Sequence, residues 1–256
     1  GQGRGAAWGG GGEAPPAGLL RRFGLEAPPP IQSVESTKWI VDAAFRIIER
    51  ESPDLVYCTT NDYVFHHFAP GQTPAKAQIA AVDAAVARIH ALEPERQIYL
   101  TADHGMNKKT VIVNFQTAAE RAGFSLYCLA PLKDRYVENH IYQEGGMLYV
   151  FLRDKKQAPA FYEFARRHEQ VEQVLKCEEA AAQFHLPADR IGDYVLFSAK
   201  GSAFGEVEGE RIFTEESRTH GSLYEREIPL IAINPEAGEE RYRYHMDIAA
   251  NLWNAF

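Results

Sequence analysis

One stretch decides the fold class: residues 97–106 read QIYLTADHGM. The apolar run 97–101 predicts a short buried strand, and residues with metal-binding chemistry follow it at once. An earlier run, LVYCT at 55–59, predicts a second buried strand, and an Asp–His motif follows this strand too. A helical pattern over 73–92, which begins with Thr-Pro, separates the two strands. The order strand, helix, strand predicts right-handed βαβ units and a mostly parallel sheet.

The same two patterns alternate along the rest of the chain. A helix is predicted from Ser33 or Ser36 to Pro53, because its apolar residues recur at helical spacing. Further helices are predicted over 115–122, 158–168, 178–184 and 246–253, and further strands over 125–130, 147–152, 171–176, 194–198 and 228–233. We therefore expect the α/β fold class, with a mostly parallel sheet sandwiched by helices and a small αβ subdomain inserted at about residues 145–205.

Composition excludes several classes of protein. The chain has 256 residues, of which 45% are hydrophobic, so it can bury a core and is not disordered throughout. Its net charge of −8 argues against binding to nucleic acid polymers. It has no apolar run long enough to cross a membrane, so we expect no membrane partner. The three cysteines are an odd count at wide spacing, which favours a reducing, cytoplasmic location over a disulfide framework.

The first 30 residues differ from the rest of the chain. Residues 1–30 hold nine glycines and five prolines. Such a segment does not bury enough apolar surface to offset its ordering entropy, so we predict that residues 1–30 are disordered. The folded domain is expected over 31–256.

Three acidic or histidine clusters carry the chemistry. They are Asp62 with His66, then Asp103-His104-Gly105, and finally Thr219-His220-Gly221. Ligands bind beyond the carboxyl ends of strands in open α/β sheets, so the first two clusters are expected at one sheet edge. Carboxylate oxygens and imidazole nitrogens are zinc ligands in hydrolytic sites. Either pair alone can arise by chance, and a loop aspartate can simply cap a turn, but their joint occurrence favours a metal site.

These motifs resemble those of the alkaline phosphatase superfamily, in its nucleotide pyrophosphatase/phosphodiesterase branch, and are most similar to phosphonoacetate hydrolases. The residues that carry the resemblance are TTNDYVFHHFAPG at 59–71, TADHGMNKK at 101–109, PADRIGD at 187–193 and His220-Gly221. The resemblance covers residues 31–254. It implies an alkaline phosphatase-like fold and a zinc-dependent hydrolase of small phosphorylated or phosphonate substrates, for which an oligomer is possible.

The resemblance also implies a ligand set. Carried over by position, Asp62, His66 and His220 would hold one zinc, and Asp103 with His104 would hold a second. In the family, the second zinc also takes an aspartate from the first strand. The family's nucleophile is a threonine or serine at the start of a helix, and it attacks phosphorus in line.

The sequence departs from this pattern at its beginning. No aspartate precedes Asp42, which lies on a predicted helix, and no strand precedes that helix. We therefore assign no catalytic residue and expect the second zinc site to be incomplete. We also expect an amino-terminally truncated chain that is inactive alone. The alternative is a non-catalytic zinc-binding or interaction module on the same scaffold.

Three further features are interpreted from their sequence context. Lys108 and Lys109 are predicted to be a solvated pair, with contact to a substrate carboxylate or phosphate as the alternative. Cys58 lies in an apolar run and is predicted to be an inert core thiol. His67 is predicted to be a surface residue.

Overall fold

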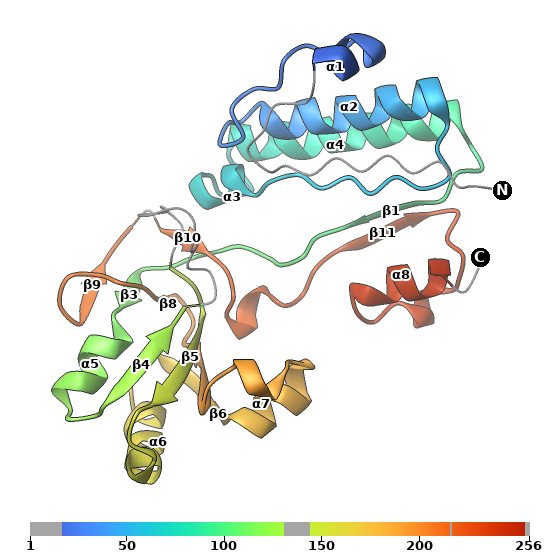
Figure 1. Ribbon diagram of the computed structural model, residues 1–256. Coiled ribbons are helices and arrows are strands. Elements are labelled where there is room, and N and C mark those ends of the chain that lie inside the picture. The colour runs from blue at the N-terminus through green and yellow to red at the C-terminus, as the bar shows by residue number, and fades with distance from the viewer. Residues whose placement is uncertain (1–16, 131–143, 216, 254–256) are drawn as a thin grey trace. The chain divides into compact units, whose positions relative to one another are not determined.

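The computed structural model describes residues 17–130, 144–215 and 217–253. They form two compact units. One unit runs up to Thr101 and resumes at Pro229, and the other covers Ala102–Ile228 (Figure 1). Residues 145–205, for which the sequence predicts an inserted αβ subdomain, lie within the second unit.

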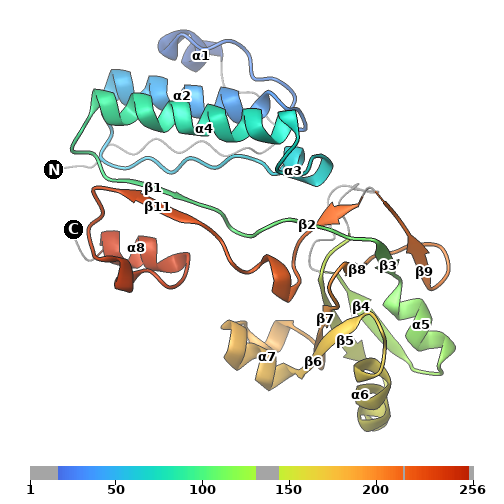
Figure 2. The ribbon, with the colours of Figure 1, turned by 180° about the vertical axis from the view of Figure 1, so that it is seen from behind.

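The first unit is mostly helical. Its helices are α1 (Ala17–Phe23), α2 (Ser36–Glu51), α3 (Tyr63–His67), α4 (Thr73–Leu92) and α8 (Met246–Trp253), with a 3-10 turn at Glu239–Arg241. Helices α2 and α4 lie side by side in both views (Figures 1 and 2). Arg88 of α4 joins them, because its guanidinium lies 3.7 Å from the ring centroid of Phe45 and 2.7 Å from Asp42 Oδ1. The unit also contains β1 (Ile98–Thr101), antiparallel to β11 (Leu230–Ile233).

The second unit is built on a four-stranded antiparallel sheet. Its strand order is β4 (Leu126–Leu129), β5 (Met147–Leu152), β7 (Tyr194–Ser198) and β6 (Val171–Lys176). Every residue of β7 is buried, so both faces of the sheet are covered. Successive β7 residues belong to two different core clusters, as the alternation of side chains along a strand requires. Helices α5 (Phe115–Arg121) and α6 (Ala158–Arg166) contribute to one cluster, and α7 (Cys177–Phe184) contributes to the other.

Short strands connect this sheet to the motif loops. Strand β3 (Val111–Val113) pairs in parallel with β8 (Ser202–Phe204) and antiparallel with β9 (Arg211–Phe213). Strand β2 (Asn107–Lys108) pairs antiparallel with β10 (Arg218–Thr219). The unit's 3-10 turns lie at Lys155–Gln157, Ala188–Arg190 and Leu223–Glu225.

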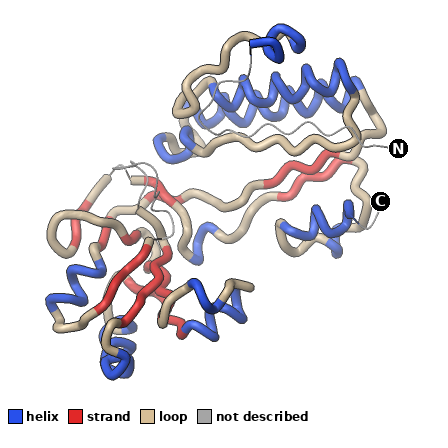
Figure 3. Tube along the Cα trace, viewed as in Figure 1, coloured by secondary structure: helices blue, strands red, loops and turns tan. Residues whose placement is uncertain are grey.

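The α/β class and the predicted helices are confirmed, but strand pairing differs from the expectation. Among the strand pairs of the described residues, β3 with β8 is the parallel pair and the others are antiparallel. The run 55–59 contributes a single bridge at Leu55 and is otherwise loop, drawn in tan between α2 and α3 in Figure 3. Leu55 is 59% and Tyr57 77% exposed, so the apolar run does not gain the neighbours that make a buried strand.

Two further differences concern the first unit. Helix α1 forms within the segment predicted to be disordered, and it buries Phe23. Residues 1–16 lie outside the described residues. Cys58 is exposed, so its prediction as a core thiol is wrong, because the strand that would have buried it does not form.

None of the helices that the structure describes combines the length and the apolarity that a membrane span requires.

Candidate metal centre

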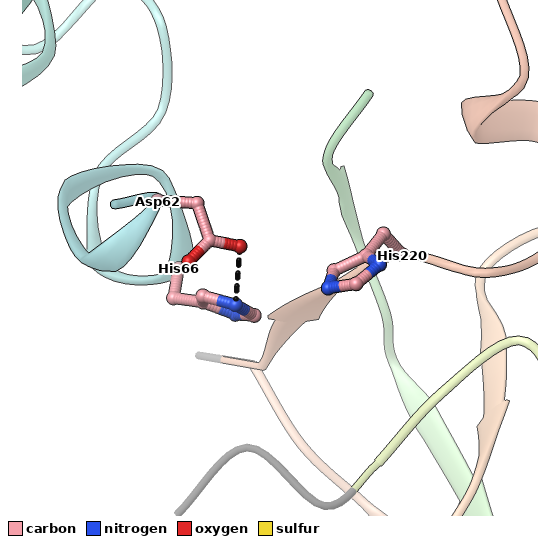
Figure 4. A group of neighbouring side chains, drawn as sticks. All are labelled: Asp62, His66 and His220. Carbon is pink, nitrogen blue, oxygen red and sulfur yellow. Dashed lines mark ion pairs between the residues drawn. The ribbon is translucent and has the colours of Figure 1, made fainter. Parts of the chain in front are cut away.

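The first motif lies at the start of α3. Asp62 precedes the helix, but its side chain makes no capping hydrogen bond, so it does not have the turn-capping role that sequence alone left open. Its Oδ2 lies instead 3.1 Å from Nε2 of His66, one turn further on (Figure 4). The His66 residue is 6% exposed, whereas the Asp62 side chain is 43% exposed. The pair thus presents one carboxylate oxygen and one imidazole nitrogen side by side.

Asn61 fixes the position of this motif within its unit. Its Nδ2 donates hydrogen bonds to Ser36 Oγ at 2.7 Å and to the Ile31 carbonyl at 2.8 Å. Its own carbonyl accepts a bond from Nε2 of Gln78, on α4, at 3.3 Å. The start of α2 and the body of α4 therefore hold the segment that carries Asp62.

The second motif prepares His104 as a ligand. Nδ1 of His104 lies 2.9 Å from the Gly105 carbonyl oxygen, and a carbonyl only accepts hydrogen bonds. Nδ1 therefore carries the proton, which leaves the lone pair of the neutral ring on Nε2. That nitrogen lies 3.6 Å from Oδ2 of Asp103. A histidine that gives one N–H to a carbonyl and offers the other nitrogen is the usual arrangement of a metal-binding imidazole.

The third motif meets the second within the same unit. The rings of His104 and His220 stack with centroids 3.4 Å apart and planes 6° apart. The β2–β10 pairing places Asn107 opposite Thr219, the residue before His220. The His220 carbonyl also accepts a hydrogen bond from Gly146 N at 2.8 Å. His220 is the other residue labelled in Figure 4.

A buried ion pair lies beneath these two loops. Lys109 is 0% exposed, and its Nζ lies 2.9 Å from Oε1 of Glu225. The same oxygen accepts a bond from Asn107 Nδ2 at 2.8 Å, and Oε2 accepts from Ser222 N at 2.9 Å and Ser222 Oγ at 2.5 Å. Burial alone would raise the pKa of Glu225, but the bonds from Lys109, Ser222 and Asn107 outweigh it and hold that pKa below its ordinary value.

The prediction of a solvated lysine pair is therefore half right. Lys108 is exposed, but Lys109 is buried because Glu225 supplies a counter-charge from a distant part of the sequence. Neither Lys109 as a buried residue nor Glu225 was identified from the sequence. One signal was available, because Ser222-Leu-Tyr-Glu225 has the spacing of a capping box, and the structure contains this box.

The five predicted ligands thus fall into two groups. Asp62 and His66 form one group in the first unit, and Asp103, His104 and His220 form the other in the second unit. Asp42 serves neither group, because its carboxylate binds Lys38 at 2.5 Å and Arg88 at 2.7 Å. His67 is exposed, as predicted.

Comparison with known proteins defines the class. Residues 18–223 match the family of type I phosphodiesterases / nucleotide pyrophosphatases. The chain therefore belongs to this family, within the alkaline phosphatase superfamily that its motifs resemble.

Comparison with solved structures shows which individual proteins the chain resembles. The chain is similar to phosphonoacetate hydrolase from Sinorhizobium meliloti 1021 in complex with phosphonoformate, with 28% identity over 93% of this chain, 60% of that chain and a TM-score of 0.80. The complex of the same enzyme with phosphonoacetate gives the same identity and coverage and a TM-score of 0.81. Murine ectonucleotide pyrophosphatase / phosphodiesterase 5 shares the fold, with 14% identity over 75% of this chain, 50% of that chain and a TM-score of 0.50. The chain thus spans 60% of the length of the bacterial hydrolase.

Proposed function

We propose that this chain carries the zinc-binding frame of a hydrolase that acts on small phosphoric or phosphonic compounds. The proposal rests on one observation, which is that each unit contains an aspartate paired with a histidine. A carboxylate oxygen faces an imidazole nitrogen at 3.1 Å in Asp62–His66 and at 3.6 Å in Asp103–His104. Such a mixed oxygen and nitrogen donor set suits zinc.

The proposal divides the ligands between two ions. By the resemblance of the sequence motifs, Asp62, His66 and His220 are assigned to the first zinc. Asp103 and His104 are assigned to the second. Zinc, when bound, would stabilise negative charge on phosphoryl oxygens. The residues of this chain would hold the ions, with the His104 tautomer fixed by the Gly105 carbonyl.

The substrate class follows from the relatives. The Sinorhizobium enzyme is solved with phosphonoacetate and with phosphonoformate, each of which joins a phosphonate to a carboxylate. We propose an anion of this kind, or a small phosphate ester, as the substrate of the protein to which this frame belongs. A cytoplasmic location is part of the proposal, since all three cysteines are free.

We further propose that these 256 residues do not turn over substrate by themselves. No residue of the sequence fits the family's nucleophile, and the first aspartate, Asp42, is held by Lys38 and Arg88. The purified chain is therefore expected to leave bis(p-nitrophenyl) phosphate intact even when it is loaded with zinc. Zinc-dependent release of p-nitrophenolate would overturn this part of the proposal.

Zinc binding itself is tested with single alanine variants and elemental analysis. Asp62→Ala and His220→Ala should lower the affinity of the first, three-ligand site, and His104→Ala should lower the affinity of the weaker second site. His67→Ala and His90→Ala are matched controls, because both histidines are exposed and lie outside the proposed ligand set. Unchanged zinc content in both Asp62→Ala and His220→Ala would refute the assignment.

A further inference from the structure

We propose that Glu225 is a positioning residue. Its ion pair with Lys109 holds two loops, the His104 loop (residues 103–107) and the His220 loop (residues 219–222), in the arrangement that zinc binding requires. This inference rests on the proposed function, since His220 is a proposed ligand of the first zinc and His104 of the second. Glu225 would act through these histidines and would not itself contact the metal.

Glu225 first holds the loop of the second motif at two points. Its backbone carbonyl accepts a hydrogen bond from Gly105 N at 2.8 Å, directly after His104. Its side-chain Oε1 accepts a bond from Asn107 Nδ2 at 2.8 Å, where β2 begins. A Cβ on Gly105 would lie 3.4 Å from the Glu225 backbone, so the two segments are in close contact. The segment that follows His104 is thus bound directly to Glu225.

The other carboxylate oxygen holds the loop of the third motif. Oε2 accepts bonds from both the backbone N and the Oγ of Ser222, two residues after His220. Gly221 between them has φ +93°, a conformation that favours glycine, so the chain turns sharply here. On the far side of the turn, Gly146 N bonds to the His220 carbonyl. His220 therefore lies in a segment that is held from both sides.

The hydrogen-bonding capacity of the Glu225 carboxylate explains why this position has a charged pair. Both carboxylate oxygens accept hydrogen bonds, and these come from Lys109, Asn107 and Ser222. A glutamine has only one acceptor oxygen, so its amide nitrogen would face a donor. The positive charge of Lys109 offsets the cost of burying the carboxylate. One buried anion can thus join two loops that are far apart in sequence, and the stacked rings of His104 and His220 follow from that connection.

A merely structural ion pair would affect stability alone, so the test measures zinc affinity in folded protein. Glu225→Gln and Lys109→Met are compared with wild type in the full chain, by competition with a chromophoric zinc chelator. Circular dichroism first establishes that each variant is folded at the temperature used. Loss of an interaction that orients metal ligands typically weakens metal binding about 10- to 100-fold, and we expect a loss of this size in both variants.

Two matched controls test whether loss of zinc affinity is specific to the Lys109–Glu225 pair. One removes a positive charge nearby, and the other removes a different ion pair of the same unit. Lys108→Met removes the neighbouring, exposed lysine. Lys155→Met removes an ion pair with Asp193, at 2.6 Å, in the same unit, and neither residue belongs to either loop. Both controls should keep the zinc affinity of wild type.

A second readout needs no metal. Stacked imidazoles shift each other's ring-proton NMR resonances, so the metal-free Glu225→Gln variant should lose the mutual shifts of His104 and His220. If wild-type protein binds no zinc, the proposed function fails, and this NMR comparison still decides the positioning role. If Glu225→Gln does not fold, Ser222→Ala and Asn107→Ala, which each remove donors to the same carboxylate, replace it in both measurements. Folded variants with wild-type zinc affinity and wild-type histidine resonances would overturn the inference.

Discussion

His104 and His220 stack almost in parallel, with their ring centroids 3.4 Å apart. Their loops come from distant parts of the sequence, and both the pairing of β2 with β10, which places Asn107 opposite Thr219, and the bonds to Glu225 hold them together. The stacking therefore depends on backbone register as much as on the two side chains. Small residues that let the backbone segments around the two histidines approach each other closely are therefore needed to keep the site in shape.

Gly146→Ala should destabilise the second unit. A Cβ at this position would lie 2.2 Å from Ser222 N and 2.5 Å from Ser222 Cα, and these backbone atoms cannot move aside as a flexible side chain would. We expect a loss of about 1–3 kcal/mol in the free energy of unfolding, as for other overpacked sites. Urea-induced unfolding measures this change.

Gly71→Ala is the control for that substitution. A Cβ at Gly71 would meet no atom within 4 Å, and its backbone has no left-handed φ. We expect a change within about 0.5 kcal/mol, as for other surface substitutions. Equal destabilisation by the two variants would show that close approach at Gly146 is not the cause.

The buried carboxylate of Glu225 should make stability fall in acid. Burial would raise its pKa, but the bonds from Lys109, Ser222 and Asn107 hold it below the ordinary value of 4.5. Because the folded pKa is lower than the unfolded one, the stabilising contribution is fully present above pH 4.5 and is lost as pH falls through the folded pKa. Urea unfolding at a series of pH values from neutral to acid should show this loss.

Comparison with Glu225→Gln isolates this contribution from those of other carboxylates. Asp42 and Glu93 also have pKa values held below the ordinary value. Burial would raise the pKa of Asp42, but the bonds from Lys38 and Arg88 outweigh it, and at Glu93 the hydrogen bonds from Arg96 and Ser52 outweigh the opposing effect of burial. Their effects are common to both proteins. The difference in unfolding free energy should therefore shrink as the pH is lowered below 4.5. Parallel curves for the two proteins would contradict the prediction.

The elements that the sequence predicted well are those determined by local pattern. Helices α2 and α4 formed close to their predicted ranges, because apolar spacing and an initial Thr-Pro depend on near neighbours alone. Strands β5 and β7 were predicted from short apolar runs. The Asp–His motif at Asp62 and His66 was found in the same way, since one helical turn brings the two side chains together.

Features that depend on distant partners could not be predicted in this way. The run 55–59 has the composition of a strand, but a ladder needs a neighbour that local sequence does not specify. Lys109 was predicted to be solvated like its neighbour Lys108, because its partner Glu225 is distant in sequence and no nearby residue indicates the contact. The capping box at Ser222 and Glu225 was visible as a pattern, but its second use as the acceptor for Lys109 and Asn107 was not.

Phe161→Ala should be among the most destabilising core substitutions. Phe161 is 0% exposed and packs against Phe124, with ring centroids 5.5 Å apart, and against Tyr194 at 5.3 Å. Removal of a buried phenyl ring leaves a cavity and costs about 3–5 kcal/mol. Phe213→Ala is the control, because Phe213 is 76% exposed, and it should change stability by less than about 0.5 kcal/mol. Urea unfolding of both variants tests the difference, and similar losses would contradict the assigned core.

Cys128 should be almost unreactive in folded protein. Burial, with a smaller effect from Glu120, raises the pKa of its thiol to about 12. At pH 8 roughly one molecule in ten thousand would then carry the reactive thiolate. A Cys58→Ser, Cys177→Ser double variant leaves Cys128 as the remaining thiol, and its labelling by a disulfide reagent can be followed by absorbance. We expect very slow labelling in buffer and rapid labelling in urea, because unfolding restores both access and an ordinary pKa. Equal rates in the two conditions would mean that β4 does not shield this residue.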